Sequence, residues 1–82
     1  MPYIKVEDRE RLYDADFCNI ETAGELNFAI TILCKEYLFN KGECYQTYND
    51  IIGALEGCKM EMYRRKVAPY EDTKIIENGD VY

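Results

Sequence analysis

Four cations that lie close together in the last third of the sequence are the side chains best suited to chemistry. They are Lys59, Arg64, Arg65 and Lys66, and Glu61 is the one acid among them, so this segment is locally positive in a chain with a net charge of −6. An arginine guanidinium binds a phosphate or a carboxylate through two parallel hydrogen bonds. The cluster therefore predicts an anion site. The alternative is that cations at the end of a helix stabilise its dipole and pair with nearby acids.

Aromatic and amide side chains could complete such a site. Tyr63 precedes the arginine pair and Tyr70 follows it, and both offer flat rings on which a nucleotide base can stack. Asn27 and Asn49 carry amides that can both donate and accept hydrogen bonds at the edge of a base. Together with the cations, these four residues form the predicted binding site for a phosphate-bearing nucleotide.

Groups that could perform catalysis are scarce. The chain has no histidine, which removes Ser–His and Cys–His pairs and the commonest general base. It also has no glycine-rich phosphate loop and no metal-binding motif of paired carboxylates. We therefore expect a protein that is not an enzyme and carries no cofactor or metal.

The four cysteines do not have the spacing of a zinc knuckle. Cys18, Cys34, Cys44 and Cys58 include no C-x-x-C pair, and they could form two disulfides in three possible connectivities. Disulfides are typical of exported proteins, and the N-terminal residues lack the basic and then apolar pattern of a secretory signal. We therefore expect reduced thiols in a cytosolic protein, with Cys34 and Cys58 on apolar helix faces.

Composition excludes several classes of protein. Hydrophobic residues make up 48% of the 82 residues, which is too many for a disordered chain. Charged residues make up 32%, and no apolar run is long enough to cross a bilayer, so we expect no contact with a membrane. The acidic excess argues against general nucleic-acid binding, because phosphate neutralisation needs surplus Lys and Arg.

Hydrophobic periodicity predicts one long amphipathic helix in the first half of the chain. Thr22 and Glu25 have the spacing of a capping box, in which each side chain satisfies a backbone N–H of the first turn. Asn40 and Gly42 end the helix, since glycine adopts the backbone conformation common just past a helix. Its apolar stripe consists of Leu26, Ala29, Ile30, Leu33, Cys34, Tyr37 and Leu38.

A second long helix follows after a short connection and packs against the first. Thr47 or Asn49 caps it, and two adjacent amphipathic helices with a short connection form an antiparallel hairpin. Gly53 and Gly57 each weaken this helix, which indicates that another backbone, in a tight helix crossing, or a ligand approaches them closely. The apolar stripe consists of Tyr48, Ile51, Ile52, Leu55, Cys58, Met62 and Tyr63.

Shorter elements are predicted at both ends. A helix runs from Val6 to Tyr13 with acids in its first turns, and the residues before it form an extended arm that docks on the rest of the chain. At the other end, Val67-Ala68-Pro69 interrupts the second long helix, and Pro69 begins a short helix that ends near Gly79.

The last residues have two interpretations. Asn78-Gly79 could turn a β-hairpin, but the second arm would have only three residues, too few to hold it. We expect an extended tail over Asn78–Tyr82 instead.

These elements make an all-α fold: an antiparallel helical hairpin with short N-terminal and C-terminal helices and an extended C-terminal tail, in one helical domain over residues 1–82. Such a short chain buries only about 60% of its unfolded surface. Eight tyrosines and three phenylalanines are many for so small a core, and tyrosine is enriched at interfaces. We therefore expect a homo-oligomer.

Several short segments of the sequence together form a recognisable pattern. They are Met1–Ile4, Gly24–Asn27, Tyr45–Glu56, Tyr63–Arg65, Ala68–Asp72 and Glu77–Tyr82. In these segments the chain resembles a family of small uncharacterised proteins encoded by tailed bacteriophages and prophages, and the resemblance is weaker between Leu12 and Ile20. The resemblance implies a phage accessory protein that acts in the cytoplasm of the bacterial host.

Two functions follow as hypotheses. The first is an oligomeric anti-defence sponge that sequesters a cyclic or linear nucleotide signal of bacterial immunity, by analogy with small phage proteins built from helical hairpins. The second is an inhibitor or adaptor that binds a host or virion protein through an acidic, tyrosine-rich face, because a net charge of −6 attracts basic partners.

Overall fold

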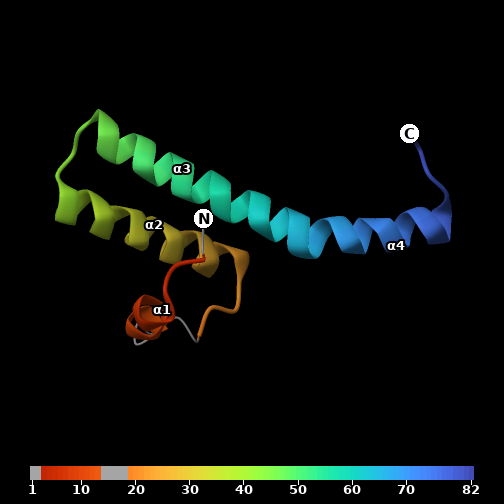
Figure 1. The fold of residues 1–82 in the computed structure, drawn as a ribbon, viewed down its shortest axis with the longest axis horizontal. Helices are drawn as coiled ribbons and strands as arrows, with labels where there is room; N and C mark the ends of the chain where they lie inside the picture. The colour runs from red at the N-terminus through yellow and green to blue at the C-terminus, as the bar shows by residue number, and fades with distance from the viewer. Residues whose placement is uncertain (1–2, 14–18) are drawn as a thin grey trace.

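The structure is a computed structural model that describes the backbone of residues 3–13 and 19–82 and the side chains of residues 3–10 and 19–82 (Figure 1). The described part is helical and contains no strand, which confirms the all-α class. Its elements are α1 (Val6–Tyr13), α2 (Ala23–Lys41), α3 (Tyr45–Met62), a π-helix η1 (Tyr63–Val67) and α4 (Ala68–Asn78). The expected thiol at Cys18 lies outside the described residues.

The start of α2 has the predicted cap at Thr22, and the return bond from Glu25 reaches the residue before the cap. The Thr22 hydroxyl accepts a hydrogen bond from the Glu25 N–H at 3.1 Å, and the Glu25 carboxylate accepts one from the Glu21 N–H at 3.2 Å. At the other end Gly42 has φ 82°, a conformation that favours glycine, and its N–H donates to the Leu38 carbonyl at 2.8 Å. Both ends of this helix are therefore determined by local residues, as predicted.

The start of α3 differs from the prediction. The helix begins at Tyr45 with Cys44 as its N-cap, so the expected caps at Thr47 and Asn49 are wrong. The physical reason is that the Thr47 hydroxyl bonds elsewhere: it donates to the Gly42 carbonyl at 2.8 Å. This bond closes the turn between α2 and α3, and Thr47 is correspondingly only 4% exposed.

The predicted interruption before Pro69 is also wrong. The chain continues from α3 through the π-helix into α4, and the three segments form one continuous rod that bends where α3 passes into α4 (Figure 1). Within η1 the turn is wider than in an α-helix, and the Ala68 N–H donates to the Tyr63 carbonyl, five residues earlier. In a regular helix the proline ring would collide with the carbonyl four residues before it. The wider turn accommodates Pro69 without ending the rod.

The end of the chain follows the prediction of a tail. Gly79 has φ 90° and its N–H donates to the Ile75 carbonyl at 2.8 Å, which ends α4 one residue after the expected start of the tail at Asn78. Residues 79–82 then form no regular element, so the alternative hairpin at Asn78-Gly79 is wrong.

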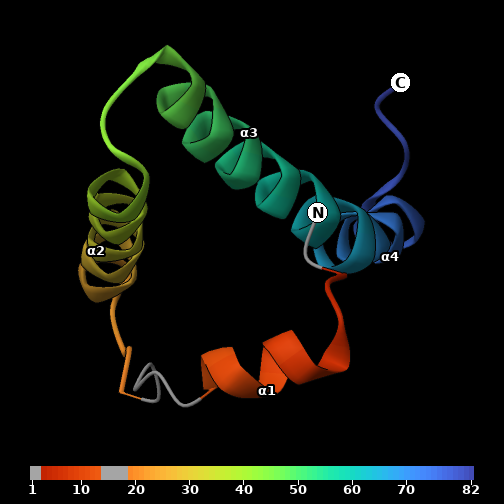
Figure 2. The same ribbon diagram turned by 60° about the vertical axis from the view of Figure 1, so that its left-hand side comes forward.

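The helices form an open frame. Helices α2 and α3 run antiparallel as the predicted hairpin, but they diverge away from the connecting turn, and α1 lies apart from both (Figure 2). The radius of gyration is 16.5 Å, compared with about 12 Å for a compact domain of this length. Within the part of the chain that the structure describes, no hydrophobic side chain is buried.

Gly53 is one of the two glycines predicted to mark a close approach of another backbone or a ligand. A methyl group placed on Gly53 would meet no atom of the described residues within 4 Å. The tight helix crossing expected at this position is therefore not formed within one chain.

The π-helix leads to a prediction about Pro69→Ala. Alanine restores the missing backbone N–H and removes the ring, so the rod can become a regular α-helix. Because proline is up to about 3 kcal/mol less favourable than alanine inside a helix, we expect a higher melting temperature and unchanged helix content. Thermal unfolding followed by circular dichroism measures both quantities, and a lower melting temperature would contradict the role assigned to the proline.

Candidate functional site

The predicted cations lie along the rod, where α3 passes into the π-helix. Lys59 is on α3, and Arg64, Arg65 and Lys66 are on η1. Arg64 Nη2 lies 2.9 Å from the Glu61 carboxylate, and Lys59 Nζ lies 3.4 Å from the Glu56 carboxylate. The structure therefore shows both Arg64 and Lys59 paired with acids of the same rod.

The other two cations are less engaged. Among the described residues, neither the Arg65 nor the Lys66 side chain makes a hydrogen bond or an ion pair, and both side chains are exposed. The charge of Arg65 is nevertheless close enough to Glu61 to help lower the pKa of that carboxyl. An anion could therefore bind them without breaking a side-chain hydrogen bond.

The Arg64 ion pair is reinforced by the N-terminal arm. The Tyr3 hydroxyl donates to the Glu61 carboxylate at 2.8 Å, so the arm docks on α3 as expected from the sequence. The hydrogen bond from Arg64 and, secondly, that from Tyr3 lower the pKa of Glu61, and the same carboxylate raises the pKa of Arg64. A negatively charged ligand would therefore have to compete with Glu61 for the Arg64 guanidinium.

Both tyrosines of the predicted site have partners on α4. The hydrogen bond between the Tyr63 hydroxyl and Glu71 raises the pKa of the Tyr63 phenol. Lys74 Nζ lies 5.5 Å from the centre of the Tyr70 ring, in the geometry of a cation–π contact. One face of the Tyr70 ring is therefore covered by an ammonium group rather than open to a base.

The two asparagines are not joined to the cations. Asn49 precedes Arg65 by 16 residues on the same rod, which corresponds to roughly 24 Å along a helix. Asn27 lies near the start of α2, at the end of the hairpin where α2 diverges from α3 (Figure 2). Neither side chain makes a hydrogen bond to Arg64, Arg65 or Lys66 in the structure.

A large hollow of the described surface is an apolar groove between α2 and α3. Its volume is about 600 Å³, and sequence reasoning did not single it out as a site. The groove is formed largely by the two predicted apolar stripes. The hydrophobic periodicity of both helices could therefore have indicated it. Its lining residues are Ile30, Leu33, Cys34, Tyr37, Asp50, Ile51, Ala54, Leu55, Cys58 and Lys59.

A phenol–carboxylate pair lies at one end of this groove. The Tyr37 hydroxyl donates to Asp50 Oδ2 at 2.7 Å, and Gln46 Nε2 donates to Asp50 Oδ1 at 2.8 Å. The hydrogen bond from Tyr37, then that from Gln46, lowers the pKa of Asp50, and the bond to Asp50 raises the pKa of Tyr37. This pair joins α2 to α3 close to the turn.

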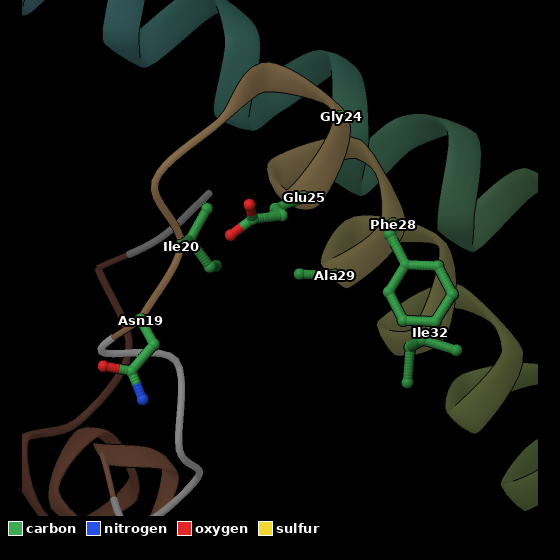
Figure 3. Close-up of a pocket in the computed structure, with 7 residues that line it drawn as sticks. All are labelled: Asn19, Ile20, Gly24, Glu25, Phe28, Ala29 and Ile32. Atoms are coloured by element: carbon green, nitrogen blue, oxygen red, sulfur yellow. The ribbon is translucent and has the colours of Figure 1, made fainter.

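A second hollow lies beside the segment that leads into α2 (Figure 3). Phe28 and Ile32 lie along α2, and Ile20 comes from the incoming segment, across from Glu25. Glu25 is the carboxylate beside the cap at Thr22 and already accepts hydrogen bonds there. The remaining lining residues are Asn19, Gly24 and Ala29.

The thiol of Cys44 lies at the start of α3, beside the turn. Its sulfur lies 3.4 Å from the Thr47 hydroxyl oxygen, and this contact, together with the nearby backbone amides of Thr47 and Gln46, lowers the pKa of the Cys44 thiol. Cys34, Cys44 and Cys58 are all unpaired, and Cys44 and Cys58 are exposed. In the described residues no three His, Cys, Asp or Glu side chains are grouped so that they could hold a metal ion.

The Tyr37–Asp50 bond leads to a prediction about pH. Asp50 has a lowered pKa, so the stability that it contributes is present above the unfolded carboxyl pKa of about 4 and is lost as pH falls through the folded value. Tyr37 has a raised pKa, so its contribution is present below about 10 and is lost at higher pH. We therefore expect Tyr37→Phe to destabilise the protein at neutral pH and to have less effect at either extreme.

Urea unfolding at several pH values measures this difference. Tyr45→Phe is the matched control, because the Tyr45 hydroxyl makes no hydrogen bond with the described residues and the side chain is exposed. If Tyr37→Phe and Tyr45→Phe were equally stable at neutral pH, the assigned role of the bond would be wrong.

Comparison with known proteins adds a family but no activity. No curated protein and no solved structure matches the chain. Along the described residues, no helix combines the length and the apolar character needed to cross a membrane. A family model does match residues 1–81, which is nearly the whole chain. The chain therefore belongs to the family described as domain of unknown function DUF6899.

Proposed function

We propose that the protein is a non-enzymatic adaptor or inhibitor that binds a basic surface of another protein through α4 and the tail. The observation that carries this proposal is the position of α4. It projects beyond the hairpin as a free-standing arm, and of the described elements only η1, with which it is continuous, packs against it (Figure 1). A helix left without a partner along its length is available for another protein.

The chemistry of the arm suits a basic partner with an apolar pocket. Residues 70–82 contain four acids against one lysine, Lys74, so the arm is strongly negative. Acidic residues at the rim steer a basic partner, and buried apolar anchors supply most of the affinity. The exposed apolar and aromatic residues of the arm are Tyr70, Ile75, Ile76, Val81 and Tyr82.

Ile76→Asp tests the arm directly. Ile76 is 85% exposed, so the change should leave the fold intact but place a charge where an anchor is needed. We expect at least a tenfold loss of affinity for a protein partner captured from bacterial lysate with the wild-type chain, on the order of 1.4 kcal/mol or more.

Phe39→Asp is the matched control, because Phe39 is 86% exposed but lies at the far end of α2. Affinity is measured by biolayer interferometry with the captured protein. An equal loss for both variants, or no loss for Ile76→Asp, would contradict recognition by the arm.

A second candidate function is the sequestration of a phosphate-bearing nucleotide signal, as an anti-defence protein of a phage. Two observations favour it: Arg65 and Lys66 are exposed and unpaired among the described residues, and the sequence resembles phage-encoded proteins. Because Glu61 already engages Arg64, the phosphate would bind mainly to Arg65 and Lys66.

Thermal shift against a panel of cyclic and linear nucleotides tests this second function. A ligand that binds only the folded state raises the melting temperature by mass action. We expect a shift for one class of nucleotide, and its loss in an Arg65→Ala, Lys66→Ala double variant but not in Lys35→Ala on α2. No shift with any nucleotide, or a shift that survives the double variant, would exclude this site.

A further inference from the structure

We infer that the groove between α2 and α3 is filled by the same groove of a second copy, so that two hairpins form an antiparallel four-helix bundle. This inference goes beyond the proposed function, because it concerns the hairpin and not the arm. It names the residues at which the copies meet and the orientation in which they do so.

The exposed area of the isolated chain supports a large interface. Its accessible surface is 7599 Å², whereas a folded monomer of this size exposes only about 5,100 Å². The excess, roughly 2,500 Å², is well above the approximately 800 Å² that each partner buries in a standard interface. An interface that uses even half of this excess is large enough for a stable dimer.

The lining of the groove suits a copy of itself. A two-fold interface brings the same patch of both chains together, so the patch must be complementary to itself. Large side chains such as Leu33 and Leu55 alternate with small ones such as Cys34, Ala54 and Cys58. Large residues of one copy can therefore fill the spaces above small residues of the other, which lets the helices approach to the usual 8–10 Å.

The chain itself offers no better occupant. Among the described elements α1 is separate enough to move into the groove, but its sequence, VEDRERLY, contains five charged residues out of eight. Placing such a helix in an apolar groove would remove charged groups from water without partners. The second copy brings an apolar surface of matching length instead.

Charge specifies the orientation. Asp50 lines the groove near the turn. Lys59, which also pairs with Glu56, lines it nine residues further along α3, which is roughly 13 Å. If the copies run antiparallel, the acid of one lies at the same level along the bundle as the base of the other. A parallel arrangement would place like charges at the same level, which is unfavourable. The antiparallel dimer also directs the two α4 arms to opposite ends.

Sedimentation velocity with a pair of matched variants tests the interface. Leu55 and Met60 both lie on α3 and are 40% and 62% exposed in the single chain, but only Leu55 lines the groove. We expect a dimer for the wild type at micromolar concentration. Leu55→Glu should raise the dissociation constant at least about tenfold, because it places a charge in the apolar interface, and Met60→Glu should leave it unchanged.

A wild-type monomer at all concentrations would overturn the inference, and so would a Leu55→Glu variant that dimerises as well as Met60→Glu.

Because a dissociated variant can also unfold, a second measurement uses the wild type alone. Cys58 lines the groove, whereas Cys44 caps α3 at the turn, and both thiols are exposed in the single chain. As the protein concentration rises, the alkylation rate of Cys58 should fall while that of Cys44 stays constant. A Cys58 rate that does not change with protein concentration would contradict the interface.

Spin labels on the arms test the orientation. The label is attached to a single cysteine introduced by Ile76→Cys. The native cysteines are removed, Cys18 and Cys44 by serine and Cys34 and Cys58 by alanine. Residue 76 lies about 33 Å along the rod from the middle of the interface. The antiparallel dimer predicts a label separation of roughly 65 Å, and a parallel dimer less than about 30 Å. The shorter distance would refute the antiparallel form. None of these experiments involves a binding partner of the arm, so their failure and that of the proposed function are distinguishable.

Discussion

The absence of an enclosed apolar core is the constraint on which the rest of the described structure depends. Hydrophobic burial normally supplies most of the stability of a small domain, yet no apolar side chain of the described part is buried within one chain. What holds α2 and α3 together near the turn is largely polar: the Thr47 hydroxyl on the Gly42 carbonyl, and the Tyr37 phenol on Asp50. These few bonds orient the two helices without sealing the space between them, so the groove remains available to another molecule.

Tyrosine has a different role from the one that its abundance suggested. Composition indicated rings for stacking and for interfaces, but several phenols of the described residues act as hydrogen-bond donors to carboxylates. Tyr3 reaches Glu61 and Tyr37 reaches Asp50, and in each case the acid also accepts a hydrogen bond from a second donor, Arg64 or Gln46. Each such pair joins segments that are distant in sequence or that belong to different helices. The tyrosines thus contribute to the positioning of the frame as well as to its exposed surface.

The features that could be predicted from the sequence are those set by neighbouring residues. The cap at Thr22 and the glycine ends at Gly42 and Gly79 depend on a few adjacent positions, and all three are confirmed. The cap at Cys44 and the wide turn before Pro69 were missed, because each depends on which of several partners a group selects after folding. A hydroxyl such as that of Thr47 can cap a helix or close a turn, and the sequence contains no signal that decides between them.

The candidate anion site shows the same limit. The pairing of Arg64 with Glu61 could have been anticipated, since residues three apart are neighbours on a helix. The two asparagines were chosen for the chemistry of their amides alone, and amide chemistry carries no information about distance. A site assembled from side chains on separate helices can be predicted only when the packing of those helices is known. Here that packing leaves Arg65 and Lys66 as the available cations of the set.

The continuity of the rod connects the groove to the arm. Had Pro69 interrupted the helix as the sequence predicted, α4 would follow a flexible joint, and binding a partner would require that joint to become ordered. The π-helix instead carries α3 into α4, so the direction of the arm is set by the hairpin before a partner arrives (Figure 1). A preorganised element loses less conformational entropy on binding and therefore binds more tightly for the same contacts. In an antiparallel dimer, the same rigidity would hold two acidic arms at a fixed separation, and a partner with two basic sites at that spacing would be favoured over one with a single site.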